Sequence, residues 1–140
     1  QPMEHGNGRL RIVFNGENYN YRDLRDELAA RGAVFRTQSD TEVLLHLWER
    51  EGPAMLPRLR GMFAFALWDE EKRGLFMARD PYGIKPLFYS LDGGQLRFAS
   101  LSKGLDAGGA LSREVDPAAV APQIPGLALT NGLRLYIGSE

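Results

Sequence analysis

The sequence predicts an α+β fold in which a buried sheet lies between a layer of helices and a second sheet. The main observation is Met62–Trp68, an unbroken apolar run in which large residues alternate with mostly small ones. A strand that is apolar on both faces is buried on both sides. Two helical patterns precede this run, and short strand patterns separated by turns follow it. That order is typical of α+β layers.

The first strand and the first helix are predicted close to the N-terminus. Leu10–Phe14 is apolar and β-branched, and Asn15-Gly16 follows it. Asn-Gly is a strong turn dipeptide, so the strand is expected to end there. A helix is expected over Tyr21–Arg31, capped by Asn20.

A second helix is predicted after a short strand at Val34–Arg36. Ser39–Glu42 has the pattern of a capping box, in which a serine and a glutamate satisfy the first N–H groups of a helix. The helix is expected to end before Gly52-Pro53, and Leu56–Arg60 is expected to form a short helical turn.

The strands after Trp68 are predicted to continue as an antiparallel meander. They are Leu75–Arg79, Leu87–Ser90 and Gln95–Ser100, separated by polar or glycine-rich turns. Beyond them the pattern weakens. A short helix is expected within Leu101–Gly109, and one further strand at Leu133–Ile137.

The composition excludes several classes of function. Seventeen basic and 18 acidic residues give a net charge of −1, which argues against a nucleic-acid face and a polybasic membrane patch. No apolar run approaches the roughly 20 residues of a membrane helix, and no export signal is visible, so a cytoplasmic location is expected. There is no cysteine, and His5 and His46 are the only histidines. We therefore expect no disulfide, no cysteine nucleophile and no metal site.

Two positions have both a structural and a chemical interpretation. Asn15 and Gly16 taken alone favour a turn, but an amide side chain beside a glycine N–H is also suited to an oxyanion hole. Asp40 at a helix start is stabilised by the helix dipole, but the same carboxylate suits the ammonium group of an amino acid. Local sequence favours the structural interpretation of both. His46, between two leucines, is assigned no chemistry.

Five segments together resemble a known family. They occur in the family's order across roughly residues 10 to 100, and the wording of the first, Asn-Gly-Glu-Asn-Tyr-Asn-Tyr, is similar to the Asn-Gly-Glu-Ile-Tyr-Asn-Tyr of glutamine-hydrolysing asparagine synthetases. The segments are Val13–Arg22, Ser39–Val43, Arg60–Asp69, Ala78–Leu87 and Phe98–Ser100. Each segment alone is weak, whereas five in order are specific.

The resemblance implies the glutaminase domain, a class II glutamine amidotransferase, with the four-layer αββα sandwich of N-terminal nucleophile hydrolases. Residues 1–100 would be the core of this domain and 101–140 its end and a poorly matched tail. Asn15 and Gly16 would form the oxyanion hole. Glu17 would contact the glutamine substrate and Asp40 would hold its α-amino group. Asn15 and Gly16 would also line the glutamine site.

The resemblance also implies partners outside this sequence. The family hydrolyses glutamine to glutamate and ammonia, and a C-terminal ATP-using synthetase domain transfers the ammonia to aspartate. We therefore expect no cofactor in this chain, and ATP and magnesium only in that other domain. Neither a nucleic acid nor a membrane is expected as a partner, and a homo-oligomer is left open.

The departures from the family pattern define the alternative. The family's nucleophile is an N-terminal cysteine with a free α-amine, which this sequence lacks, so we expect a domain that is incomplete at its N-terminus and lacks its own nucleophile. Asn18 replaces a usually apolar residue, and Leu101 a usually acidic one.

The alternative function is a non-catalytic scaffold or binding module derived from the same fold. The ammonia acceptor and the origin of the truncation are not determined by the sequence.

Overall fold

The computed structural model describes residues 1–92, 94–106, 127–130 and 133–138. The helical elements are α1 (Tyr21–Ala30), α2 (Asp40–Glu51), the 3-10 helix η1 (Gly52–Arg58) and α3 (Ser102–Asp106). The strands are β1 (Met3–His5), β2 (Leu10–Asn18), β3 (Gly61–Asp69), β4 (Gly74–Arg79), β5 (Phe88–Asp92), β6 (Gln95–Ala99), β7 (Leu127–Thr130) and β8 (Leu133–Gly138).

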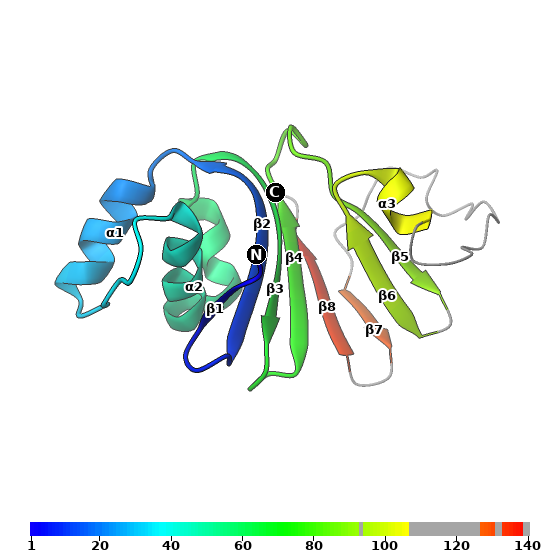
Figure 1. Ribbon diagram of the computed structural model, residues 1–140, viewed down its shortest axis with the longest axis horizontal. Helices are drawn as coiled ribbons and strands as arrows, with labels where there is room; N and C mark the ends of the chain where they lie inside the picture. The colour runs from blue at the N-terminus through cyan, green and yellow to red at the C-terminus, as the bar shows by residue number, and fades with distance from the viewer. Residues whose placement is uncertain (93, 107–126, 131–132, 139–140) are drawn as a thin grey trace.

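The strands form two sheets. The larger, here called the main sheet, has the order β1-β2-β3-β4-β8-β7, and β5 pairs with β6 in a separate hairpin. All neighbours are antiparallel except β4 and β8, which are parallel. Helices α1 and α2 cover one face of the main sheet, and the hairpin covers the other with α3 on its outer side (Figure 1). The four layers expected for an αββα sandwich are therefore present.

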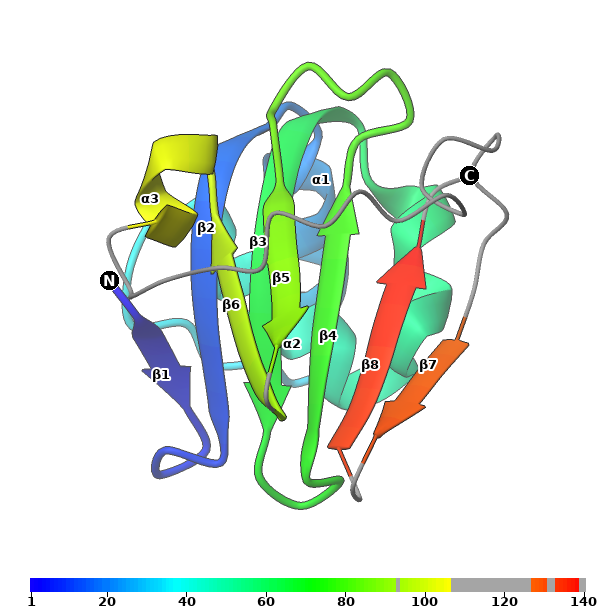
Figure 2. The ribbon, with the colours of Figure 1, turned by 90° about the vertical axis from the view of Figure 1, so that its right-hand side faces the viewer.

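Strand β3 shows why the main sheet is buried on both sides. Phe63, Phe65 and Leu67 belong to the large core that β2 and β3 form with the helices. Ala66, on the other face, packs with Met77 in a second and smaller cluster. Side chains alternate between the two faces of a strand, so the large and small residues of β3 separate as the sequence predicts. Figure 2 shows β5 and β6 in front of β2 and β3, on the face that carries the small residues.

The prediction that β2 ends in a turn at Asn15-Gly16 is wrong. Strand β2 continues to Asn18, and Asn15 pairs with Ala64 of β3. Gly16 has φ +150°, and a Cβ atom added there would overlap the carbonyl oxygen of Met62. Only glycine fits so close to β3. Gly16 therefore allows β2 and β3 to pair without interruption and does not form a turn.

Other local predictions have mixed outcomes. Helices α1 and α2 and the strands β4, β5, β6 and β8 lie where they are predicted. No strand forms at Val34–Arg36, where Val34 is exposed. Asn20 makes no capping bond; its side chain instead hydrogen-bonds the backbone of Arg58 and Arg60.

The predicted meander does not continue through β5 and β6, which form a separate two-stranded sheet. The end of the helix predicted within Leu101–Gly109 lies outside the described residues.

Within the described part of the chain, no helix has the length and apolar character needed to cross a membrane.

Candidate functional site

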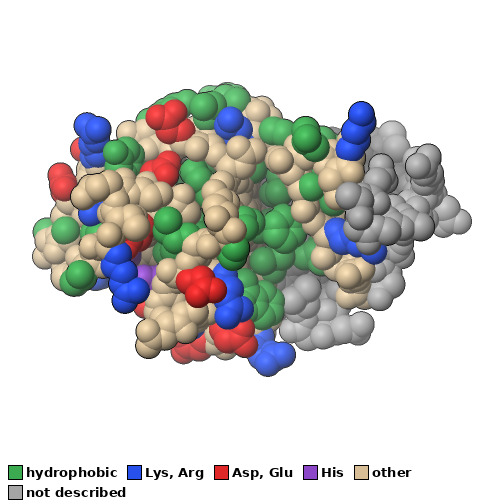
Figure 3. All heavy atoms as spheres, viewed as in Figure 1, with side chains coloured by type: hydrophobic (Ala, Val, Ile, Leu, Met, Phe, Trp, Pro, Cys, Tyr) green, Lys and Arg blue, Asp and Glu red, His purple; other side chains and the backbone are tan. Residues whose placement is uncertain are grey.

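Asn15 faces a cavity between the main sheet and the hairpin. The cavity has a volume of about 210 Å³. Hydrophobic side chains gather in the hollow at the middle of the molecule (Figure 3). The cavity wall consists of residues from both sheets and from the N-terminus: Gln1, Val13, Phe14, Asn15, Ala64, Phe65, Ala66, Pro86, Leu87, Phe98, Ala99 and Ser100. Asn15 is exposed, and among the described residues none hydrogen-bonds its side-chain amide. That amide is therefore available to a ligand.

Gln1 completes the strand edge beside this amide. Its Nε2 donates to the carbonyl oxygen of Phe14 at 2.7 Å, and its Oε1 accepts from the N–H of Phe14 at 2.9 Å. The side-chain amide of Gln1 thus reproduces the two hydrogen bonds that a neighbouring strand residue makes. This pairing holds the backbone next to Asn15 in place at the edge of the cavity.

Asp40 is tied to the end of the strand that carries Asn15. Its Oδ2 accepts a hydrogen bond of 3.0 Å from the N–H of Asn18. Asn18 is fully buried, and its Nδ2 has no hydrogen-bond partner. The first turn of α2 is also fixed by Ser39, whose Oγ accepts from the N–H of Thr41 at 3.2 Å. The N-terminus of α2 is therefore anchored at the end of β2.

The four site residues predicted from the sequence lie at one end of β2 and α2, but not in one cavity. Asn15 lines the cavity between the sheets, whereas Asp40 is absent from its wall. Glu17 is exposed, and the alternation along β2 places it on the same face as Asn15. Gly16 between them contacts β3 closely, so its backbone has a structural reason to be glycine that is independent of any ligand.

Glu42 does not form the predicted capping box with Ser39. Its carboxylate accepts hydrogen bonds from the N–H groups of Arg36 and Thr37, both at 2.7 Å, and from Thr37 Oγ1 at 2.6 Å. Burial raises the pKa of Glu42, but these donors outweigh it and the pKa is lowered overall. The buried charge therefore holds the loop before α2, where a strand was expected.

Asp80 holds the loop that brings the hairpin over the cavity. It is 1% exposed. Its Oδ1 accepts from the N–H groups of Tyr82 and Ile84, and its Oδ2 from those of Lys85 and Phe63, at 2.9–3.3 Å. Burial raises the pKa of Asp80, but the four donors outweigh it and lower the pKa overall.

Sequence reasoning considered Asp80 only as a partner of Arg79 and did not recognise this role. An aspartate followed by Pro-x-Gly is a recognisable local signal, because aspartate commonly accepts hydrogen bonds from N–H groups that follow it in a turn. Pro86 and Leu87, which end this loop, form part of the cavity wall. Asp80 is thus a positioning residue for that wall.

Comparisons with known proteins agree with the fold. The family model described as "Glutamine amidotransferase domain" matches residues 1–130. Asparagine synthetase [glutamine-hydrolyzing] 1 of Bacillus subtilis is 48% identical over 105 residues, which cover 75% of this chain and 17% of that protein. A putative asparagine synthetase of Mycobacterium tuberculosis is 55% identical over 98 residues, which cover 69% of this chain and 15% of that protein.

A solved structure of glutamine phosphoribosylpyrophosphate amidotransferase from B. subtilis superimposes with a TM-score of 0.67 at 33% identity. The match covers 84% of this chain and 28% of that one. The chain therefore spans less than one fifth of the two asparagine synthetases described above. The family match over residues 1–130, together with the layered fold shared with the solved amidotransferase, shows that this chain belongs to the glutamine amidotransferase domain family.

Proposed function

We propose that this chain provides the oxyanion-stabilising and substrate-binding part of a glutaminase site, which releases ammonia from glutamine. The observation that carries the proposal is the side-chain amide of Asn15, which faces a cavity between two sheets and has no hydrogen-bond partner among the described residues. Fixed N–H donors that point to where negative charge develops stabilise the tetrahedral intermediate of amide hydrolysis. The family match supports this chemistry over other uses of a free amide.

Asn15 is well placed for this task because its backbone is rigid. It lies in a strand that is paired on both sides, with β3 on one side and the side chain of Gln1 bound to the preceding residue on the other. An oxyanion donor acts most strongly when it needs no reorganisation during the reaction. We assign the second donor to the N–H of Gly16, the next residue along the strand.

Asp40 and Glu17 are proposed to bind the amino-acid end of glutamine. The carboxylate of Asp40 is half-buried, and its Oδ2 accepts from the N–H of Asn18. Among the described residues, its Oδ1 has only a long contact of 3.5 Å with Thr41 Oγ1. That oxygen is available to an α-ammonium group, and charge-assisted hydrogen bonds are stronger than neutral ones. Glu17 is exposed on the same strand face as Asn15.

The covalent step requires a group that is not among these 140 residues. The sequence contains no cysteine, and a thioester intermediate needs a thiolate. We therefore propose that the activity belongs to a longer protein, in which a cysteine-led segment precedes this region and an ATP-using domain transfers the ammonia to aspartate. The names of the similar proteins, glutamine-hydrolysing asparagine synthetases, support the link between glutamine hydrolysis and asparagine synthesis, and this chain covers only 17% and 15% of the two described above.

The location and assembly of that longer protein are also proposals. Amide transfer that consumes ATP in the presence of magnesium is expected in the cytoplasm, where ATP is supplied. A homo-oligomer is compatible with β1 at the edge of the main sheet, because edge strands can pair between copies.

The proposal is tested on a longer form in which a cysteine-led segment precedes Gln1. Ammonia release and glutamine binding by calorimetry are measured for this form and for Asp40→Asn. Asparagine keeps an oxygen acceptor for the N–H of Asn18 but loses the charge, so the expected result is glutamine affinity about 10- to 100-fold weaker. Asp23→Asn, in the first turn of α1, is the matched control and should change affinity less than about twofold.

Two results would oppose this proposal. A longer form that binds no glutamine and releases no ammonia would favour the scaffold alternative. Equal affinities of the wild-type and Asp40→Asn forms would remove Asp40 from the site while leaving the role of Asn15 standing.

A further inference from the structure

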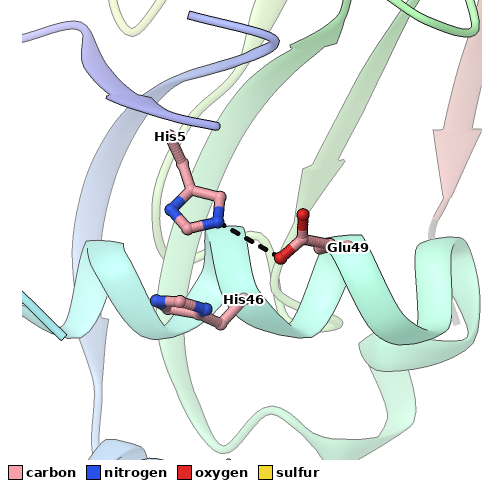
Figure 4. A group of neighbouring side chains, drawn as sticks. All are labelled: His5, His46 and Glu49. Atoms are coloured by element: carbon pink, nitrogen blue, oxygen red, sulfur yellow. Dashed lines mark hydrogen bonds and ion pairs between the residues drawn. The ribbon is translucent and has the colours of Figure 1, made fainter. Parts of the chain in front are cut away.

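The two histidines of the chain meet Glu49 on the helix-covered face of the main sheet. His5 is the last residue of β1, whereas His46 and Glu49 lie three residues apart on α2 and so share one helix face. One ring nitrogen of each histidine and one carboxylate oxygen of Glu49 all lie within 4.8 Å of one another. Figure 4 shows the imidazole of His5 above that of His46, with Glu49 beside them. This group is here called the histidine cluster.

His46 is buried, and one of its ring nitrogens has no polar partner among the described residues. It is 4% exposed, and its Nε2 has no hydrogen bond. Its ring centroid lies 4.4 Å from that of His5 and 4.5 Å from that of Phe35. The ring is therefore held in place by its aromatic neighbours and not by a hydrogen bond at Nε2.

Glu49 and His5 are already spaced as two ligands of one ion. His5 Nε2 lies 3.2 Å from Glu49 Oε2. Two ligands at about 2.0–2.1 Å from a tetrahedral zinc ion are separated by about 3.3 Å. Arg9 Nη2 binds the other carboxylate oxygen, Oε1, at 3.2 Å, and so fixes the orientation of the carboxylate. Such outer hydrogen bonds commonly orient metal ligands.

We propose that His5, His46 and Glu49 bind a divalent transition-metal ion of the Zn²⁺ class. Two imidazoles and a carboxylate are a donor set for zinc, whereas calcium and magnesium take oxygen ligands. An open depression of about 340 Å³ that includes all three residues leaves room for water as the fourth ligand. The ion binds one ring nitrogen of each histidine, and it joins the edge strand β1 to α2.

Nearby positive charges set the expected affinity. Arg9 and Arg50 lie close to the cluster, and Arg50 lines the same depression. Arg9 also pairs with Glu71 at 3.0 Å, which offsets part of its charge. Three ligands with adjacent cations are expected to bind zinc in the micromolar range, with a Kd below about 10 μM, and not as tightly as a four-ligand structural site.

Zinc titration of the 140-residue chain, purified without a histidine tag, tests the proposal by calorimetry and by the visible spectrum of bound Co²⁺. We expect one ion per chain. His5→Ala and Glu49→Gln should each weaken binding at least about tenfold. Glu4→Gln is the matched control, because Glu4 precedes His5 on β1 but pairs with Arg11 outside the cluster. It should change binding less than about twofold.

The readouts separate a specific site from incidental zinc binding. A tetrahedral Co²⁺ spectrum that is lost in His5→Ala, together with a zinc-dependent rise in melting temperature seen only in the wild type and Glu4→Gln, supports the site. His5 lies at a sheet edge, so circular dichroism can verify that His5→Ala remains folded. A Kd weaker than about 10 μM, or equal binding by the wild type and His5→Ala, overturns the proposal.

Discussion

The two faces of the main sheet differ in how they are filled. The face toward α1 and α2 carries large residues of β2 and β3, which form one continuous core with the helices. The face toward the hairpin carries Ala64, Ala66 and Val13, and its cluster of fully buried residues consists of Ala66 and Met77 alone among the described residues. The same two strands thus build a packed core on one side and the wall of a cavity on the other.

This difference indicates that one face of the main sheet contributes mainly to stability and the other to the proposed chemistry. The helix-covered face removes large side chains from water and stabilises the domain. The hairpin-covered face uses small residues, which leave space for a ligand beside Asn15. Residues on the first face are therefore expected to affect unfolding, and those on the second to affect the proposed reaction.

The largest effect on stability is expected from Phe65→Ala. Phe65 is 1% exposed in the helix-covered core, and truncating a buried phenylalanine typically costs about 3–5 kcal/mol. Val13→Ala on the other face, where Val13 is only half-buried, should cost about 1 kcal/mol. Urea unfolding measures both. Equal losses would contradict the difference between the faces.

Gly16→Ala is expected to cost about 3 kcal/mol, because the added methyl group meets the backbone of β3 and φ is +150°. Gly32 is the control. It also has positive φ, +90°, but nothing lies within 4 Å of an added Cβ, so Gly32→Ala should cost about 1 kcal/mol. Both values come from urea unfolding. A cost at Gly16 no greater than at Gly32 would show that β2 is not held so close to β3.

Asp80→Asn is expected to cost about 2 kcal/mol at pH 7, since a buried carboxylate that accepts four backbone N–H groups is replaced by a neutral amide. The pKa of Asp80 is lowered in the folded state from its ordinary value of 3.8. Its contribution is therefore present above that value and is lost as the pH falls through the folded pKa.

The measurement is the free energy of unfolding of the wild type and Asp80→Asn as the pH is lowered from neutral to acid. The difference between the two proteins should shrink as the pH falls below 3.8. A difference that is independent of pH would show that the charge of Asp80 is not what holds the loop.

The smallest effect is expected from Glu71→Gln, outside both faces. Glu71 pairs with Arg9 at 3.0 Å, but its side chain is 70% exposed. Exposed ion pairs are screened by water and salt, so the expected loss is less than about 0.5 kcal/mol. Urea unfolding at low and high salt checks this. A loss as large as that of Asp80→Asn would contradict the ranking.

Patterns contained within one element predicted the fold correctly. The alternation of large and small residues in β3 indicated a sheet buried on both sides, and the serine at the start of α2 caps it through Thr41. These signals are local, because the side chains that produce them belong to the element itself. The order of the five segments that resemble the family then predicted which family the fold belongs to.

Features that depend on distant partners were not predictable. The Asn-Gly pair favours a turn locally, but Gly16 is required by Met62 and Phe63, more than 40 residues later. Val34–Arg36 has β propensity but pairs with no strand among the described residues, and Glu42 holds the backbone of Arg36 and Thr37 as a loop. Likewise, nothing in the local sequence of His5 indicates that it meets His46.

The site was predicted from the resemblance more than from local chemistry. Local sequence favoured a structural interpretation of both residues, a turn for Asn15 and a helix start for Asp40. The turn is now excluded, because Asn15 lies in a strand. The structure places Asp40 at the end of the same strand through Asn18. The roles of both residues in glutamine hydrolysis stay predictions.

The most direct test of the central claim is the rate of glutamine hydrolysis by Asn15→Ala in the longer, cysteine-led form. If the amide of Asn15 stabilises the oxyanion, kcat falls about 10²–10³-fold while KM changes little, because this interaction is strongest in the transition state. A kcat within about twofold of the wild type would contradict the account and leave Asn15 as a strand residue that happens to face a cavity.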